Sequence, residues 1–183
     1  MIKFYSSKDF CFLLLFFVVF KFSAAQHSET NMMYIDTSYH KVNERFFIDT
    51  TGVSIVPPAH YLPFVQNDKW GFIHKGAAST IQVQIFDGVI YTMLSAGLTA
   101  EELLKQNVTL KEHYMILTND NQKADLFVVS FFVKGLDKDL EYERLMLLTG
   151  DHTRTIWINA NYPVIAKSVV FNVLKESLLS VEF

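Results

Sequence analysis

The sequence predicts an α/β (α+β) fold, a three-layer α/β/α sandwich built on a mostly antiparallel sheet. Four strand-like runs in the C-terminal half are joined by short connections rich in Asn, Asp and Gly, which favours an antiparallel meander. Helix signals occur in the middle of the chain and again near its C-terminal end. One strand-like run is apolar on both faces, as expected where helices cover both sides of a sheet.

The first 25 residues have the pattern of a signal peptide. Basic residues precede an apolar run over residues 10–20, and Ser23-Ala24-Ala25 supplies the small side chains that signal peptidase accepts. We therefore expect cleavage after Ala25 and a secreted or periplasmic protein with no transmembrane anchor, because the run is too short to span a bilayer. A retained short anchor helix is the alternative. Cys11 lies at the start of the apolar run, so the pattern does not predict a lipoprotein.

Composition excludes several classes of chemistry for the mature chain. Cys11 is the only cysteine, so a disulfide scaffold, a thiolate zinc site and a cysteine nucleophile are all excluded after cleavage. The first 25 residues carry three lysines and one aspartate, which leaves a net charge of −5 on the rest compared with −3 for the whole chain. This charge argues against nucleic acid as the main partner.

The mature chain begins with a flexible arm, residues 26–44, which is polar and has no strand or helix periodicity. A single sandwich domain is predicted over residues 45–183. Its first elements are short strand-like runs at 45–48 and 53–56, which the turn-forming residues 49–52 join either as a hairpin or as a strand with a tight bend. The proline pair at 57–58 ends the second strand, and residues 59–68 are predicted to be a loop.

Two more strands are predicted at residues 70–74 and 80–86. In the second, apolar and polar side chains alternate, so one face is predicted to be buried and the other polar. A helix is expected over 89–96. The next helix should start after Thr99, with Glu102 as its capping-box partner, and run to about Asn107.

The remaining strands are predicted at residues 110–117, 124–133, 140–149 and 155–161. Both faces of 124–133 are apolar, which predicts a central strand. Pro163 is expected in the first turn of a terminal helix, whose apolar stripe packs on the sheet. That stripe contains Ile165, Ala166, Val169, Val170, Val173, Leu174 and Leu178. The tail, 180–183, either pairs at a sheet edge or extends the helix.

No catalytic or metal-binding motif stands out. No two of the six histidines are two to four residues apart, and no cofactor site is predicted. A site assembled from distant segments of the chain, such as His60 with His74, stays an alternative. The acidic run over residues 137–143 is interpreted as a solvated turn, with a calcium site as the alternative. Asn107 begins a glycosylation sequon whose use depends on the host.

Aromatic side chains gather in and just after the predicted loop at 59–68. Exposed aromatic residues on loops are typical of sites that bind proteins or sugars. Core packing is the alternative, above all for Trp70. The predicted interaction surface consists of Pro57, Pro58, His60, Tyr61, Phe64 and Trp70.

Several strings and the order of the elements resemble the PsbP-like α/β/α sandwich superfamily, in particular its small secreted DcrB-like bacterial members. The strings are Val53-Ser54-Ile55-Val56-Pro57-Pro58 and Ile158-Asn159-Ala160-Asn161-Tyr162-Pro163, the second followed by a helix that ends in Lys175-Glu176-Ser177-Leu178-Leu179-Ser180. The resemblance covers about residues 46–183. Envelope members are often lipoproteins, whereas this leader has no lipid-attachment cysteine.

The resemblance implies a non-enzymatic accessory or interaction domain, because relatives serve photosystem assembly, small-GTPase binding and envelope roles. It supplies no catalytic residues. We therefore expect a secreted or periplasmic protein that binds another protein or an envelope component. Two alternatives are a hydrolase that uses dispersed His and Asp/Glu residues and a carrier of small apolar ligands.

Overall fold

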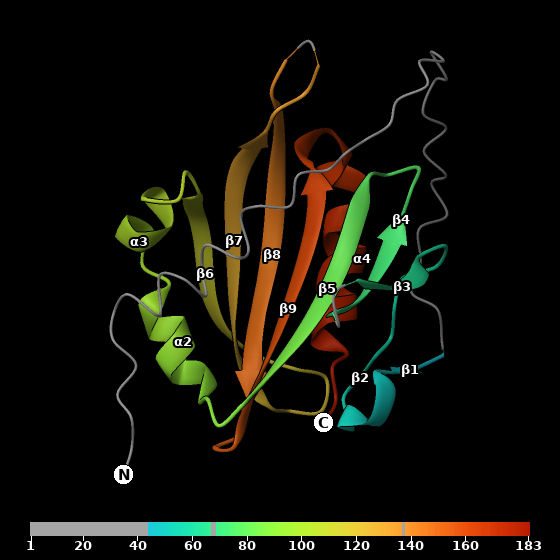
Figure 1. Ribbon diagram of the computed structural model, residues 1–183, viewed down its shortest axis with the longest axis vertical. Helices are drawn as coiled ribbons and strands as arrows, with labels where there is room; N and C mark the ends of the chain where they lie inside the picture. The colour runs from blue at the N-terminus through green and yellow to red at the C-terminus, as the bar shows by residue number, and fades with distance from the viewer. Residues whose placement is uncertain (1–43, 67–68, 137) are drawn as a thin grey trace. The chain divides into compact units, whose positions relative to one another are not determined.

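An antiparallel sheet forms the centre of the fold (Figure 1). The computed structural model describes residues 44–66, 69–136 and 138–183, so the predicted signal peptide and almost all of the predicted arm lie outside the described residues. Within these ranges seven strands follow the order β3-β4-β5-β9-β8-β7-β6. Every neighbouring pair is antiparallel. The bounds are Leu62–Gln66 (β3), Lys69–His74 (β4), Ser79–Asp87 (β5), Thr109–Leu117 (β6), Lys123–Val133 (β7), Leu140–Gly150 (β8) and Arg154–Pro163 (β9).

The prediction of a loop over residues 59–68 is wrong, because β3 occupies Leu62–Gln66. Pro63 is the cause of the error, since proline cannot donate to a ladder and a run that contains it does not look like a strand. An edge strand tolerates proline, because one side of its backbone has no partner. Among the strands of the described residues, β3 pairs with β4 alone.

The C-terminal meander is confirmed, but β7 is not the central strand. The middle position of the sheet belongs to β9, and β7 is the neighbour of the edge strand β6. Leu126, Phe127, Val128 and Val129 are nevertheless all buried. Apolar side chains on both faces indicate that both faces of a strand are covered, which does not fix its place in the strand order.

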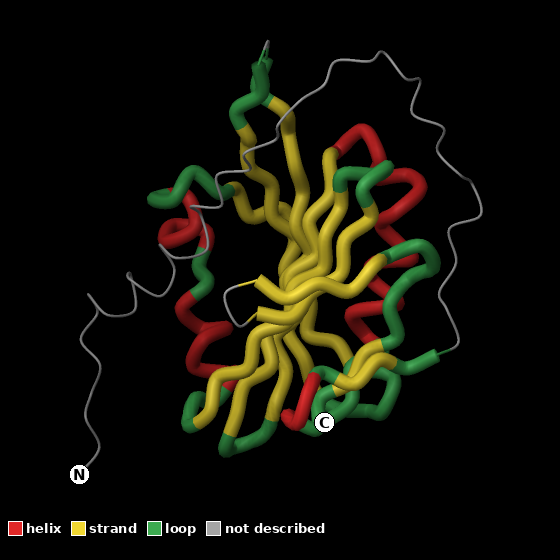
Figure 2. Tube along the Cα trace, turned by 45° about the vertical axis from the view of Figure 1, so that its right-hand side comes forward, coloured by secondary structure: helices red, strands yellow, loops and turns green. Residues whose placement is uncertain are grey.

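Helices lie on both faces of the sheet, which confirms the predicted sandwich. In Figure 2 the sheet lies between α2 and α3 on one side and α4 on the other. These helices span Tyr91–Gly97 (α2), Ala100–Leu104 (α3) and Lys167–Leu179 (α4). The predicted cap is confirmed, because the Thr99 side chain accepts a hydrogen bond from the Glu102 amide at 3.2 Å. No helix among the described residues is long and apolar enough to cross a membrane.

The terminal helix begins later than predicted. Pro163 is the last residue of β9 and pairs with Tyr142, so it does not lie in the first turn of the helix. A short 3-10 turn, η2 (Val164–Ala166), separates it from α4. Within the predicted apolar stripe Ile165 is exposed, because the side of the helix that faces the sheet carries Ala166, Val170, Leu174 and Leu178.

The main core lies between the sheet and α4. Alternate residues of the strands fill it, with Ile81 and Val83 from β5, Leu145 and Leu147 from β8, and Ile158 from β9. The other alternate residues form the opposite face. Its buried apolar part, which lies beside α2 and α3, contains Phe127, Val129, Met146, Leu148 and Trp157.

Of the two forms predicted for the N-terminal runs, the hairpin is the one observed. Strands β1 (Phe46–Phe47) and β2 (Ser54–Ile55) pair antiparallel around the 3-10 turn η1 (Asp49–Thr51) and form a sheet of their own. Of the two outcomes predicted for the C-terminal tail, pairing is the one observed. Ser54 and Glu182 form an antiparallel bridge.

Candidate functional site

Polar side chains replace apolar ones on part of the sheet face that lies opposite α4. They come from β5, β8 and β9, which are neighbours in the sheet although β5 is far from the other two in sequence. We name this group the amide patch. It consists of Thr80, Gln82, Gln84, Arg144, Asn159 and Asn161.

Strand register places these side chains in rows across the sheet. Asn161 lies opposite Thr80 on one side and opposite Arg144 on the other, and Gln82 lies opposite Asn159. Directly opposite residues of antiparallel strands point to the same face. The amide patch is therefore continuous across three strands.

Hydrogen bonds fix the first row. Arg144 Nε donates to Asn161 Oδ1 at 2.6 Å, and Asn161 Nδ2 donates to Thr80 Oγ1 at 3.1 Å. The Arg144 guanidinium also lies over the Phe131 ring, 4.9 Å from its centroid, which is within the range of a cation–π contact. The guanidinium is thus held in one orientation by two neighbouring strands.

The charge of Arg144 is not matched by a carboxylate of the part of the chain that the structure describes. No Asp or Glu among the described residues forms an ion pair with it. Burial lowers the pKa of the Arg144 guanidinium to about 10, so the side chain keeps its charge at neutral pH. Removing a charge from water without a partner costs free energy, which makes this position unfavourable for stability alone.

Asn159 supplies a second incomplete interaction in the same patch. Its side chain is 1 % exposed, and its Oδ1 accepts a hydrogen bond from Trp157 Nε1 at 2.9 Å. Its Nδ2 has no hydrogen-bond partner within the described part of the chain. A buried donor without an acceptor costs about 1–3 kcal/mol, so such a group in a folded protein calls for an explanation.

The rest of the patch is polar and only partly accessible. Thr80 and Gln84 are buried, whereas Gln82, Arg144 and Asn161 are half-buried. The polar face predicted for residues 80–86 is therefore present, with much of it withdrawn from solvent. The patch is able to offer amide donors, amide acceptors and one guanidinium to a ligand.

The residues of the predicted interaction surface differ in their exposure and do not all point to one face. Pro57, Pro58 and Tyr61 are buried, His60 is exposed, and Phe64 and Trp70 are half-buried. Phe64 lies opposite Gly71 in the β3–β4 pair, whereas Trp70 lies opposite Val65. Phe64 and Trp70 therefore point to opposite faces of this hairpin, because adjacent positions along a strand alternate.

Each of these two aromatic rings has a packing role. A Cβ atom on Gly71 would lie 2.7 Å from Phe64 Cζ, so the ring occupies the space that the glycine leaves. On the other face Trp70 packs on Phe46, with ring centroids 5.8 Å apart. Core packing, the predicted alternative for Trp70, thus accounts for part of its surface.

The structure does bring His60 and His74 together, with ring centroids 6.5 Å apart. His74 Nδ1 accepts a hydrogen bond from the Ala77 amide at 3.0 Å and is therefore not available to a metal ion. Among the described residues no group of three or more His, Cys, Asp or Glu side chains is arranged to hold a metal ion.

One histidine–carboxylate pair of the kind that the hydrolase alternative requires is present. His113 Nε2 lies 3.2 Å from Asp125 Oδ1, and its ring stacks on Phe127 with centroids 4.1 Å apart. His113 is exposed on the edge strand β6. The pair therefore lies at the border of the sheet and not among the rows of the amide patch.

The interpretation of residues 137–143 as a solvated turn is wrong for Glu143. This carboxylate is buried on the α4 face, where Oε2 accepts a hydrogen bond from Tyr162 at 2.7 Å and Oε1 binds Lys167 Nζ at 2.9 Å. Asp137 lies outside the described residues. Because both oxygens of Glu143 are engaged, it serves as a buried structural acceptor.

Sequence reasoning missed the amide patch. A signal was present, since Asn159 and Asn161 alternate with apolar residues in a strand, as Gln82 and Gln84 do. Alternation of this kind predicts a solvated face. Only the strand order shows that these faces adjoin Arg144.

Comparisons with known proteins support the fold. No protein-family model and no curated protein sequence matches the chain. Among solved structures, cyanobacterial PsbP (CyanoP) from Synechocystis has a TM-score of 0.57 at 10 % identity and covers 87 % of this chain and 98 % of its own. The Ran-binding protein Mog1p from Saccharomyces cerevisiae has a TM-score of 0.55 at 10 % identity, with 78 % and 95 % covered.

A third solved structure is a protein from Bacteroides thetaiotaomicron, with a TM-score of 0.51 and 14 % identity. The match covers 78 % of this chain, which spans about half of that protein's length (48 %). These likenesses establish the fold alone. The chain has the α/β fold that CyanoP and Mog1p share, which is the fold that its resemblance implied. The resemblance to DcrB-like members stays a prediction.

Proposed function

We propose that the chain is a non-enzymatic accessory protein that binds another protein through the amide patch. The observation that carries this proposal is the buried Asn159 amide, whose Nδ2 lacks an acceptor within the described residues. A bound partner would supply one. The fold is compatible with such a role, because Mog1p, which is similar in structure, is a Ran-binding protein.

The proposal includes export. The basic start, the apolar run over residues 10–20 and Ser23-Ala24-Ala25 support a signal peptide and hence a secreted or periplasmic location. The partner would then be a protein or another component of the cell envelope. Mass spectrometry of the protein recovered outside the cytoplasm should find Gln26 at the mature N-terminus. A mature N-terminus at Met1 would contradict export.

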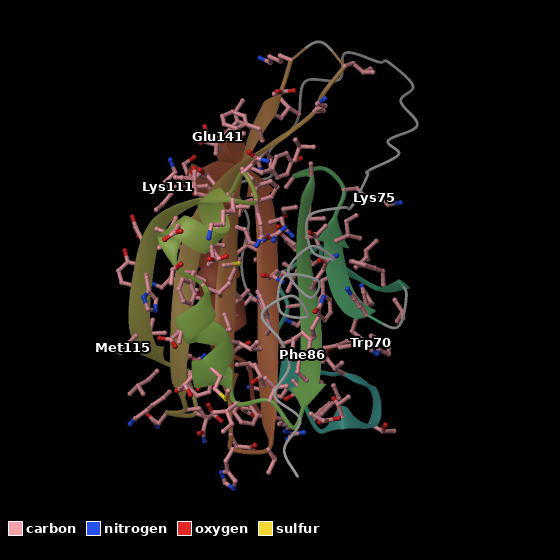
Figure 3. All side chains as sticks on the ribbon, turned by 60° about the vertical axis from the view of Figure 1, so that its left-hand side comes forward. Trp70, Lys75, Phe86, Lys111, Met115 and Glu141 are labelled. Carbon is pink, nitrogen blue, oxygen red and sulfur yellow. The ribbon has the colours of Figure 1, made fainter. Side chains whose placement is uncertain are left out.

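Affinity capture from the native envelope fraction tests the binding surface. Wild-type protein and the patch variants Arg144→Gln and Asn161→Ala are used as bait, with Lys111→Gln as the control. Lys111 is an exposed cation on the edge strand β6 (Figure 3). Proteins captured by the wild type and the control should be lost from the patch variants, provided that circular dichroism shows all of them folded.

The surface predicted from sequence is the competing location. A further bait, Trp70→Ala, removes the half-buried ring from the face of the β3–β4 hairpin that is opposite to Phe64. We expect it to capture the same proteins as the wild type. If both patch variants still capture these proteins and Trp70→Ala does not, the binding surface lies on that hairpin and not on the amide patch.

A further inference from the structure

We propose that the partner is a polypeptide segment with an acidic side chain, whose carboxylate binds between the Arg144 guanidinium and the Asn159 amide. This inference rests on the proposed function, because it assigns a chemistry to the partner of the amide patch. Three features of the patch carry it, namely the unmatched charge of Arg144, the position of the Asn159 donor, and the presence of a single cation beside two glutamines.

The first feature is an unmatched positive charge in a fixed orientation. The Nε–H of Arg144 is engaged by Asn161, and the Phe131 ring lies against the guanidinium. Nη1 and Nη2 make no hydrogen bond to any described residue. Guanidinium donors arranged as a fork match the two oxygens of a carboxylate, so the ligand group that this position selects is an anion.

The second feature is the position of the Asn159 donor. Asn159 lies opposite Met146, which is two residues after Arg144 on β8, so Asn159 and Arg144 are diagonal neighbours on one face. Such neighbours are about 7–8 Å apart in antiparallel sheets. A carboxylate bound to the Arg144 guanidinium would lie next to Asn159. It would complete the bonding of the buried Asn159 Nδ2 once the side chains that cover this atom move aside.

The third feature distinguishes a peptide from other anions. Arg144 is the only charged residue of the patch, and one cation matches the single negative charge of a carboxylate. A phosphate-rich ligand requires a concentrated positive field. Gln82 and Gln84 carry both a donor and an acceptor, as a peptide group does, and they extend along β5 beside the carboxylate position.

Nuclear magnetic resonance titration with capped tripeptides tests this inference. The probes are acetyl-Thr-Glu-Thr-amide, its Gln analogue, acetate and inorganic phosphate. We expect the Glu peptide to shift the side-chain signals of Arg144 Nε–H and Asn159 Nδ2–H2. The Gln peptide should bind about tenfold more weakly or worse, because hydrogen bonds to a charged acceptor are the stronger kind.

Two variants and a control make the titration specific. Arg144→Gln removes the charge, and Asn159→Asp places a repelling carboxylate in a side chain of the same shape. Both should reduce binding of the Glu peptide about tenfold or more, whereas Lys111→Gln should bind it as the wild type does. The backbone spectrum of each variant reports whether it is folded. If one variant fails to fold, the other decides.

The possible outcomes separate this inference from the proposed function. Equal binding of the Glu and Gln peptides overturns the inference, as does a Glu-peptide affinity that neither variant changes. Acetate or phosphate that binds as tightly as the Glu peptide also overturns it, since the ligand would then be a free anion. If such a result is accompanied by patch-dependent protein capture, the proposed function stands without an acidic partner. Glu-peptide binding without capture of any protein contradicts the proposed function alone.

Discussion

At the scale of single residues, two neighbouring charges on β8 have opposite surroundings. Glu143 and Arg144 are adjacent in sequence, but successive side chains of a strand point to opposite faces of the sheet. Glu143 therefore faces α4 and is bound by Tyr162 and Lys167. Arg144 lies on the opposite face as part of the amide patch, where no carboxylate of a described residue pairs with it. The alternation of side chains along the strand thus keeps these two adjacent charges apart.

Replacement of Tyr162 by Phe should destabilise the fold. The variant leaves the buried Oε2 of Glu143 without the hydroxyl that donates to it, at a cost of about 1–3 kcal/mol. Urea unfolding at pH 7 measures this loss. The matched control is Tyr114→Phe, since Tyr114 is exposed on β6 and should change stability little. Equal stability of Tyr162→Phe and the wild type would contradict the role of this bond.

The same residue should make stability depend on alkaline pH. Burial and the hydrogen bond to Glu143 raise the pKa of Tyr162 well above its ordinary value of 10. Above pH 10 the unfolded chain releases this proton while the folded chain retains it, so stability falls as pH rises. Unfolding curves from pH 8 to 11 should show a steeper decline for the wild type than for Tyr162→Phe. Parallel declines would show that Tyr162 does not contribute.

Gly71 should not accept a side chain. A Cβ atom there would lie 2.5 Å from the Ile81 carbonyl oxygen and 2.7 Å from Phe64 Cζ. We expect Gly71→Ala to destabilise the protein by about 1–3 kcal/mol, because a close-packed site must shift to admit a methyl group. Thermal unfolding measures the effect. Addition of Phe64→Leu, which shortens the obstructing side chain, should make the methyl group less costly, and an unchanged cost would assign the strain to the carbonyl alone.

At the scale of elements, the sequence predicts best those segments whose periodicity is undisturbed. The four C-terminal strands and the start of α3 are confirmed to within a few residues, because alternation and capping are local signals. The two errors in element boundaries described above are at prolines. Because of Pro63, the edge strand β3 was not predicted. Pro163 was predicted to lie in a helix, although it is the last residue of β9. Proline cannot donate a backbone hydrogen bond to a neighbouring strand. The sequence alone does not show whether a donor is needed at that position.

The cap of α3 gives a prediction at this scale. Thr99→Ala removes the oxygen that accepts from the Glu102 amide, and should lower the free energy of unfolding by about 1 kcal/mol. Thr99→Ser retains an acceptor and should restore most of the loss. Both are measured by urea unfolding. If Ser and Ala at this position are equally destabilising, the cap is not the source of the effect.

At the scale of the whole molecule, the amide patch exists only because of the strand order. Residues 80–84 join residues 159–161 across the β5–β9 pair, and β8 brings Arg144 to the other side of β9. Nothing local in the sequence specifies that β5 pairs with β9, since the meander from β6 to β9 lies between them in the chain. The sequence therefore allowed the sandwich to be predicted, but not this site.

Within the described ranges the sheet ends at two edges, β3 and β6, and each edge carries a feature that opposes pairing with another chain. β3 contains Pro63, which has no amide hydrogen to donate to another strand. On the other edge, β6 is interrupted by a register shift between Leu110 and Glu112. Prolines and bulges are common devices against edge-to-edge aggregation. This protection favours a partner that binds a face of the sheet, as proposed for the amide patch.

Side-chain and backbone contacts tie the N-terminal hairpin of the domain to its C-terminal end. The Ser180 hydroxyl accepts a hydrogen bond from the Val56 amide at 2.7 Å and donates to the Ser177 carbonyl at 2.6 Å. Arg45 Nη1 donates to the Ser180 carbonyl at 2.7 Å. Because Ser180 is buried, water cannot readily replace these bonds.

Ser180→Ala should therefore weaken the contact between the N-terminal hairpin and the C-terminal end of the domain. It leaves the Val56 amide without its acceptor, which we expect to cost about 1–3 kcal/mol. Hydrogen exchange should accelerate at Val56 and in β2, while the amides of β8 and β9 in the middle of the sheet respond less. Ser168→Ala, at an exposed position of α4, is the matched control and should leave exchange unchanged. Uniform acceleration across all strands would show that the contact stabilises the whole fold and does not act as a local clamp.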